Sequence, residues 1–117
     1  MKKTENKLEV VKPFDDSVFE SHAGKVGGKK NLRLVSIKLP EDELEYVYLI
    51  KKPSRATIQA LGEAGKKKDQ DKAQKLLLGC VLEGDKEAYD YDGSIYVALL
   101  DKISKIAEQT KSDVKKI

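Results

Sequence analysis

Two apolar segments joined by a short acidic turn place the strongest limit on how this chain can fold. Residues 32–39 read Leu-Arg-Leu-Val-Ser-Ile-Lys-Leu, and residues 44–51 read Leu-Glu-Tyr-Val-Tyr-Leu-Ile-Lys. Both segments are rich in β-branched, aromatic and large aliphatic residues, which favour strands. Pro40 and the acidic residues after it suit a turn. The pattern therefore predicts a β-hairpin over residues 32–51.

The two faces of this hairpin are not divided cleanly into apolar and polar. The second segment places Leu44, Tyr46, Tyr48 and Ile50 on one face, yet Val47 and Leu49 lie on the other. The first segment changes phase between Leu34 and Val35. We expect either a bulge at this point or partial cover on both faces of the sheet.

Helical patterns follow the hairpin, over residues 54–66, 70–83 and 94–115. Ser54 suits an N-cap for the first, and the last contains no glycine or proline. The middle pattern has apolar residues at helical spacing: Ala73, Leu76, Leu77, Cys80 and Val81. Strands followed by helices predict an α+β fold, here a hairpin and a three-helix carboxy-terminal bundle in one domain over residues 31–117.

Residues 1–30 differ from the rest of the chain. They mix charged residues with few apolar ones and contain Gly24, Gly27 and Gly28. Such a composition buries too little apolar surface to offset the entropy of ordering. We expect a weakly ordered amino-terminal arm.

Composition excludes several classes of protein. The 117 residues carry a net charge of +3, and 37% of them are charged. No apolar run is long enough for a membrane span, and the amino terminus lacks the apolar stretch of a secretory signal. Cys80 and His22 are the sole residues of their kinds, so neither an internal disulfide nor a structural zinc site is expected. These features favour a cytoplasmic protein.

No arrangement of residues indicates catalysis, so we expect no enzyme, cofactor or metal site. Cys80 lies on an apolar stripe and is expected to be buried, and His22 has no recognisable catalytic partners. Four acidic residues precede the last helix, but their spacing does not match a calcium loop. We expect a solvated loop there: Asp85, Glu87, Asp90 and Asp92.

Two short motifs resemble the tail assembly chaperones of long-tailed phages and prophages, and the resemblance extends over about residues 45–108. The first is Lys52-Pro53-Ser54-Arg55, and the second is Leu77-Leu78-Gly79-Cys80-Val81-Leu82-Glu83-Gly84-Asp85. The family-motif residues are Pro53, Arg55, Leu77, Cys80, Gly84 and Asp85.

The resemblance implies a non-enzymatic protein of the host cytoplasm that binds the tape-measure protein during tail morphogenesis. The candidate client-binding residues lie on the last helix: Ile95, Leu99, Ile103, Ile106 and Ala107. The same helix is a candidate surface for a homo-oligomer.

Two other interpretations remain open. The protein can instead be a structural component of the virion, in the tail or the capsid. Less favoured is a small nucleic-acid-binding protein, because acidic residues follow the longest lysine cluster. Its candidate contacts are Lys29, Lys30, Lys66, Lys67 and Lys68.

Overall fold

A computed structural model describes residues 7–108 and 112–117 of the chain. The strands are β1 (Glu9–Val11), β2 (Leu32–Leu39), β3 (Leu44–Lys51) and β4 (Val81–Glu83). The α-helices are α1 (Ser17–Val26), α2 (Arg55–Lys66), α3 (Gln70–Leu78), α4 (Lys86–Tyr91) and α5 (Gly93–Ala107). The predicted α+β class is confirmed. Among the described residues, no helix combines the length and the apolar character needed to cross a bilayer.

The predicted hairpin is confirmed as the centre of the sheet. β2 and β3 pair antiparallel in one continuous register, from Leu32 opposite Lys51 to Leu39 opposite Leu44. The turn between them is a 3-10 helix over Pro40–Asp42. On its other side, β3 pairs with β1 in parallel along its first residues and with β4 antiparallel near its end. Because the β2–β3 register is unbroken, the change of phase in β2 is not a bulge.

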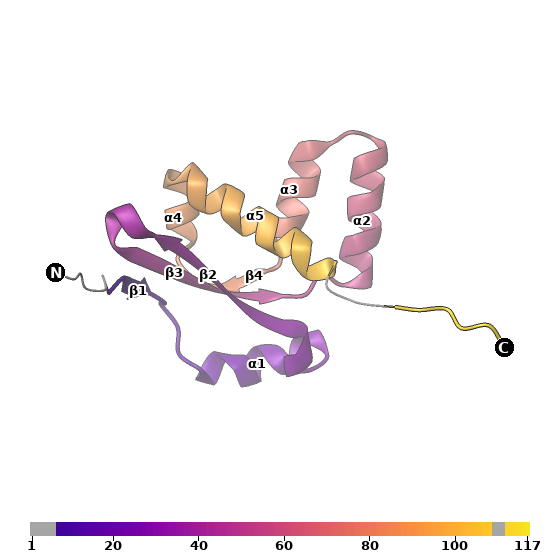
Figure 1. Cartoon of the computed structure of the whole chain (residues 1–117), viewed down its shortest axis with the longest axis horizontal. Helices are drawn as coiled ribbons and strands as arrows, with labels where there is room; N and C mark the ends of the chain where they lie inside the picture. The colour runs from indigo at the N-terminus through magenta and orange to yellow at the C-terminus, as the bar shows by residue number, and fades with distance from the viewer. Residues whose placement is uncertain (1–6, 109–111) are drawn as a thin grey trace.

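Each face of the sheet is instead at least partly covered, as the second expectation stated. Figure 1 shows α3, α4 and α5 above the sheet and α1 below it. We call the face under α5 the inner face and the face toward α1 the outer face. Val35, Tyr48 and Ile50 face inward, whereas Leu34 and Leu49 face outward.

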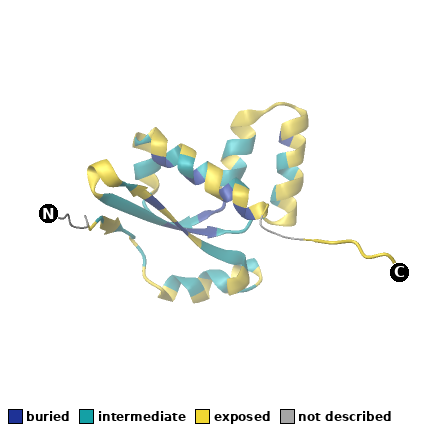
Figure 2. Ribbon diagram, viewed as in Figure 1, coloured by how far each residue is buried: buried dark blue, intermediate teal, exposed yellow. Residues whose placement is uncertain are grey.

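The core lies between α5 and the inner face. Four α5 residues pack against inner-face side chains of β2 and β3, and Cys80 and Val81 complete the cluster. Figure 2 shows these buried residues where α5 crosses the strands. The cluster consists of Val35, Ile37, Tyr48, Ile50, Cys80, Val81, Ile95, Leu99, Ile103 and Ile106.

The helix predicted over residues 70–83 is wrong in its second half. α3 ends at Leu78, and the chain turns so that the Cys80 N–H donates to the Leu77 carbonyl. Val81–Glu83 then forms β4, which pairs with β3. The apolar residues of this segment still reach the core, but the end of the segment gets its hydrogen bonds from a neighbouring strand. Pairing with β3 therefore decides the structure of residues 81–83, although their apolar spacing is that of a helix.

The weakly ordered arm is also a wrong prediction for the part of residues 1–30 that is described. Residues 9–11 add a strand to the sheet, and residues 17–26 form a helix that ends at Gly27, whose φ is 84°. The sheet supplies the hydrogen bonds and the apolar surface that this segment lacks alone.

Two boundaries near the carboxy terminus differ from prediction as well. The last helix ends at Ala107, not at residue 115, and residues 112–117 form neither helix nor strand. Residues 109–111 lie outside the described part. The expected loop at residues 85–93 contains α4, a helix of 6 residues.

A candidate partner-binding surface on the outer face of the sheet

The predicted client-binding stripe on α5 is buried in the protein's own core. Ile95, Leu99, Ile103 and Ile106 are at most 6% exposed. Of the five predicted residues, Ala107 alone is exposed, at the end of the helix. The prediction of a client face here is therefore wrong, because the sheet uses this stripe to cover its own inner face.

Gly84 and Asp85 of the second sequence motif shape the core around Tyr48. The Tyr48 hydroxyl donates to the Asp85 carbonyl at 2.7 Å. Gly84 has a φ of 138°, and a β-carbon there would lie 2.2 Å from Cδ1 of Tyr48. The Asp85 carboxylate accepts from the Ala88 N–H and so caps α4. Burial, followed by the charge of Asp85, raises the pKa of Tyr48.

The other motif residues are structural too. Cys80 is buried, and burial raises the pKa of its thiol, which opposes formation of a reactive thiolate. Leu77 packs against the core. Pro53 lies between β3 and α2, and Arg55 is the exposed first residue of α2. The motif residues therefore stabilise the core and the connections between secondary-structure elements, and they do not bring reactive groups together.

The acidic cluster before α5 caps helices. Asp85 caps α4 and Asp92 caps α5, where its carboxylate accepts from the N–H and the hydroxyl of Ser94 at 2.9 and 2.6 Å. These hydrogen bonds lower the pKa of Asp92. Within residues 7–108 and 112–117, no three His, Cys, Asp or Glu side chains are grouped as metal ligands.

The outer face carries an apolar surface that α1 covers only at one end. α1 is fixed by a 2.8 Å contact between His22 Nε2 and a Glu83 carboxylate oxygen of β4. Leu34, beside Phe19 of α1, is 51% exposed, and Val10 on β1 is 53% exposed. We define the outer patch as the four residues Val10, Phe19, Leu34 and Val47.

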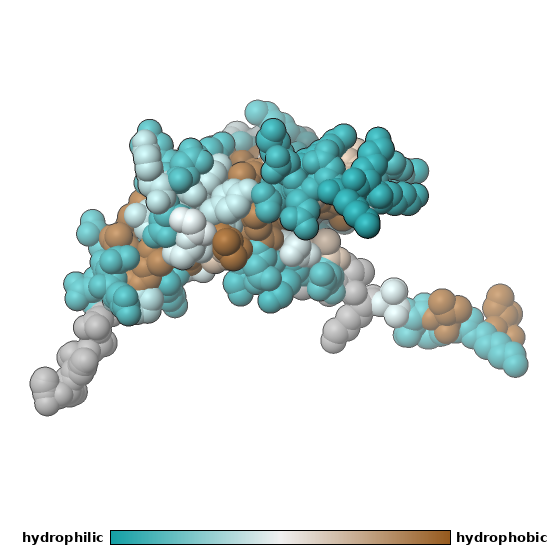
Figure 3. Space-filling model, turned by 90° about the horizontal axis from the view of Figure 1, so that it is seen from above, coloured by the Kyte–Doolittle hydropathy of each residue, from teal (hydrophilic) through white to brown (hydrophobic). Residues whose placement is uncertain are grey.

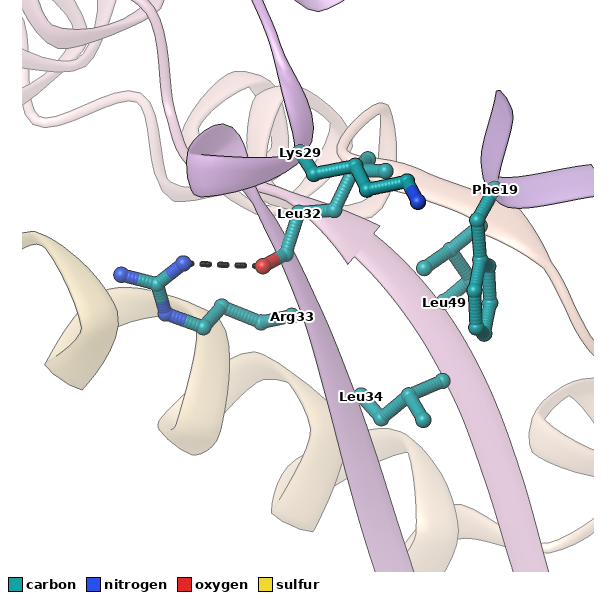
Figure 4. Close-up of a pocket in the computed structure, with 6 residues that line it drawn as sticks. All are labelled: Phe19, Lys29, Leu32, Arg33, Leu34 and Leu49. Atoms are coloured by element: carbon teal, nitrogen blue, oxygen red, sulfur yellow. Dashed lines mark hydrogen bonds between the residues drawn. The ribbon is translucent and has the colours of Figure 1, made fainter. Parts of the chain in front are cut away.

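Next to α1 the outer patch is hollowed. Figure 4 shows the Phe19 ring beside Leu34 and Leu49, with Lys29 above them. The hollow has a volume of about 170 Å³. Lys29 Nζ lies 2.5 Å from a carboxylate oxygen of Glu20, so its charge is paired at the rim. Apolar walls with a charged rim suit a hydrophobic side chain of a partner.

The helical side of the molecule is different in character. Figure 3 shows hydrophilic side chains gathered over the α2–α3 hairpin. Lys66 ends α2, and Lys67 and Lys68 follow in the connection to α3. The 3-10 helix Lys29–Asn31 lies at the other side of the molecule in Figure 1. The two lysine clusters that were predicted as candidate nucleic-acid contacts thus lie apart.

The sequence also indicates an apolar outer face, although the prediction of a partner surface was based on the apolar stripe of α5 instead. Val47 and Leu49 alternate with inward residues on β3, and Leu34 lies opposite Leu49. An apolar residue on the second face of a strand requires cover from another layer.

Comparison with known proteins identifies no relative: no family model, no curated protein and no solved structure matches the chain.

Proposed function

We propose that this protein binds another polypeptide and acts as a tail assembly chaperone for the tape-measure protein of a phage or prophage. The uncovered part of the outer face carries this proposal. Leu34 and Val10 are each about half exposed on two strands of the same face, and Phe19 lies beside Leu34. Exposed apolar side chains on one face of a sheet are typical of interaction sites.

The outer layer is built for a helical client. α1 shows that a helix packs on this face, yet the 10 residues of α1 leave Val10 and Leu34 exposed. A strand of 8 residues spans about 25 Å, and one helix is about 10 Å wide. There is therefore room beside α1 for a helix that presents apolar residues. The tape-measure protein is expected to be a long helical chain, and such a chain would supply that helix.

The charged helical side supports the same function. The protein carries 23 basic and 20 acidic residues, and they dominate the surface of the α2–α3 hairpin. A complex with one apolar face covered by the client and the other side charged stays dispersed in water. This combination suits a protein that keeps an aggregation-prone chain in solution.

Co-expression with the tape-measure protein encoded by the same phage tests the proposal. We expect the soluble fraction of the tape-measure protein to rise when the native chain is present. Leu34→Asp and Val10→Asp place a charge in the outer patch and should each weaken client binding about tenfold. Ile58→Asp is the matched control, because Ile58 is 44% exposed on α2, away from the patch.

An unchanged soluble fraction with the native chain would refute the chaperone function. Equal binding by the outer-patch variants and the Ile58→Asp control would refute this surface as the site. Recovery of the protein in mature particles, in stoichiometric amount, would instead favour a structural role in the virion.

A further inference from the structure

We propose that two copies of this chain associate by antiparallel pairing of their β2 strands, so that the two sheets become one. The inference concerns the edge of the sheet, which shares Leu34 with the outer patch, and it does not depend on the client. Two observations carry it. Some backbone N–H and carbonyl groups of β2 point away from β3, and the two ends of β2 carry opposite charges.

β2 is an edge strand. It pairs with β3 and, in the part of the chain that the structure describes, with no other strand. Ser36 and Lys38 are exposed along it, as is Leu34. An edge of this length presents unpaired donors and acceptors to any second strand that can align with it.

The hydrogen bonds at the start of β2 show which residues present those groups. The Lys52 N–H donates to the Asn31 carbonyl, whereas the Lys51 N–H donates toward β4, to Cys80. Antiparallel neighbours alternate between bonded and non-bonded pairs, so Leu32 opposite Lys51 is a non-bonded pair. By the same alternation, Leu34, Ser36 and Lys38 direct both backbone groups outward.

Leu32, the first residue that points outward, already has partners for both of its backbone groups. The free edge is therefore limited to the next three outward residues. The Leu32 N–H donates to the Lys29 carbonyl, and the Leu32 carbonyl accepts from Arg33 Nη1 at 2.8 Å. Leu34, Ser36 and Lys38 remain. A two-fold axis beside Ser36 pairs Ser36 with itself and pairs Leu34 with Lys38 of the second copy. The small Ser36 side chain fits this axis, and the Lys38 stem can cover Leu34.

The charges at the two ends of β2 complement each other in this arrangement. From Arg33 at its start to Ser36, β2 borders a hollow of about 320 Å³, which Lys102 and Lys105 of α5 also line. Asp101 is the acidic residue there, and it pairs with Lys105 at 3.1 Å. At its end, Lys38 borders a second hollow with Glu41, Asp42 and Asp92.

Antiparallel pairing places the basic start of one copy beside the acidic turn of the other. With Ser36 on the axis, Arg33 lies opposite Leu39, the last residue of β2, and therefore next to the acidic turn Pro40–Asp42 of the second copy. A two-fold interface makes this contact twice. A parallel arrangement would instead place like charges together at both ends, so charge selects the antiparallel one.

Sedimentation velocity of the purified full chain over a concentration series tests the proposal. We expect a monomer–dimer equilibrium that weakens as salt is added. Ser36→Pro removes the outward N–H at the axis and should weaken dimerisation about tenfold or more, whereas Ser36→Ala should leave it within about twofold. Circular dichroism shows whether the proline variant is folded.

A charge exchange tests the register without touching the strand. E41K/D42K makes both ends basic, and K30E/K102E makes both ends acidic, so each variant alone should dimerise about tenfold more weakly. An equimolar mixture should form a heterodimer again. K66E/K67E, which changes charge on the α2–α3 hairpin, should dimerise like the native chain.

A native chain that remains monomeric throughout the series would overturn the proposal. Dimerisation that Ser36→Pro leaves unchanged would overturn it as well, as would a mixture of the two charge variants that stays monomeric. None of these outcomes bears on the solubility assay with the tape-measure protein, so the two proposals can fail separately.

Discussion

Tyr48 has no exposed surface, and its ring occupies the space where a side chain at residue 84 would begin. Its hydroxyl reaches the Asp85 carbonyl, so the same residue joins β3 to the loop that starts α4. A glycine at residue 84 is therefore required by one aromatic side chain 36 residues earlier in the chain, whereas Asp85 gives Tyr48 its backbone carbonyl and uses its carboxylate to cap α4. Sequence pattern predicted that this pair mattered but not what it contacts.

Gly84→Ala should destabilise the protein by about 2–6 kcal/mol, because overpacking and a glycine-specific backbone conformation each cost about 1–3 kcal/mol. Urea denaturation measures the change. Gly62→Ala is the matched control, since no atom lies within 4 Å of its β-carbon position on α2 and alanine favours a helix. It should stabilise the protein slightly. Equal stability of the two variants would contradict the Tyr48 contact.

Tyr48 should also make stability fall at alkaline pH. Its pKa in the folded protein is raised above the value of about 10 in the unfolded chain. The contribution of Tyr48 to the free energy of unfolding is therefore complete below about pH 10 and is lost as the pH rises further. Tyr48→Phe should cost about 1 kcal/mol at neutral pH and flatten this alkaline decline. Tyr91→Phe, at an exposed position, should keep the native pH profile in urea melts.

Among the elements, α5 shows most clearly why periodicity predicts a buried face without identifying what buries it. Its apolar stripe was correctly located, and Ile95, Leu99 and Ile103 all lie on it. The stripe covers the inner face of the sheet, because Val35, Tyr48 and Ile50 need a partner there. A spacing rule contains no information about which surface, internal or external, meets the stripe.

Leu99→Ala should destabilise the protein by about 2–5 kcal/mol, as expected for a fully buried leucine. Val97→Ala, on the exposed face of the same helix, should change stability by less than about 0.5 kcal/mol. Thermal or urea unfolding distinguishes them. If Leu99→Ala were as stable as native and lost client binding alone, the stripe would be a client surface after all.

At the scale of the molecule, the two faces of the sheet are stabilised unequally. The inner face is covered by α5 and the core cluster, whereas α1 on the outer face contains no buried residue. The His22–Glu83 contact and the Phe19 ring hold α1 in place. Local opening starts where few apolar contacts are made, so α1 should open before the core.

Native-state hydrogen exchange should therefore be fastest in α1 and slowest in β3 and α5. His22→Ala should raise exchange in α1 by roughly 2- to 5-fold, because it removes a partly buried hydrogen bond to Glu83, and should leave α5 unchanged. Lys25→Ala, on the same helix, is the control and should have no such effect. Equal protection of α1 and α5 in the native protein would contradict this layering.

The sequence by itself determined the hairpin, the class of the fold and the positions of most helices, because these depend on local period, turn residues and caps. Only the tertiary structure decided that residues 81–83 form a strand, that the amino-terminal segment joins the sheet, and which apolar stripe stays inside. Those outcomes depend on hydrogen-bond partners and apolar surfaces supplied by residues far away in the chain. The local sequence pattern shows which side chains a segment must bury, whereas the tertiary structure determines which surface packs against them.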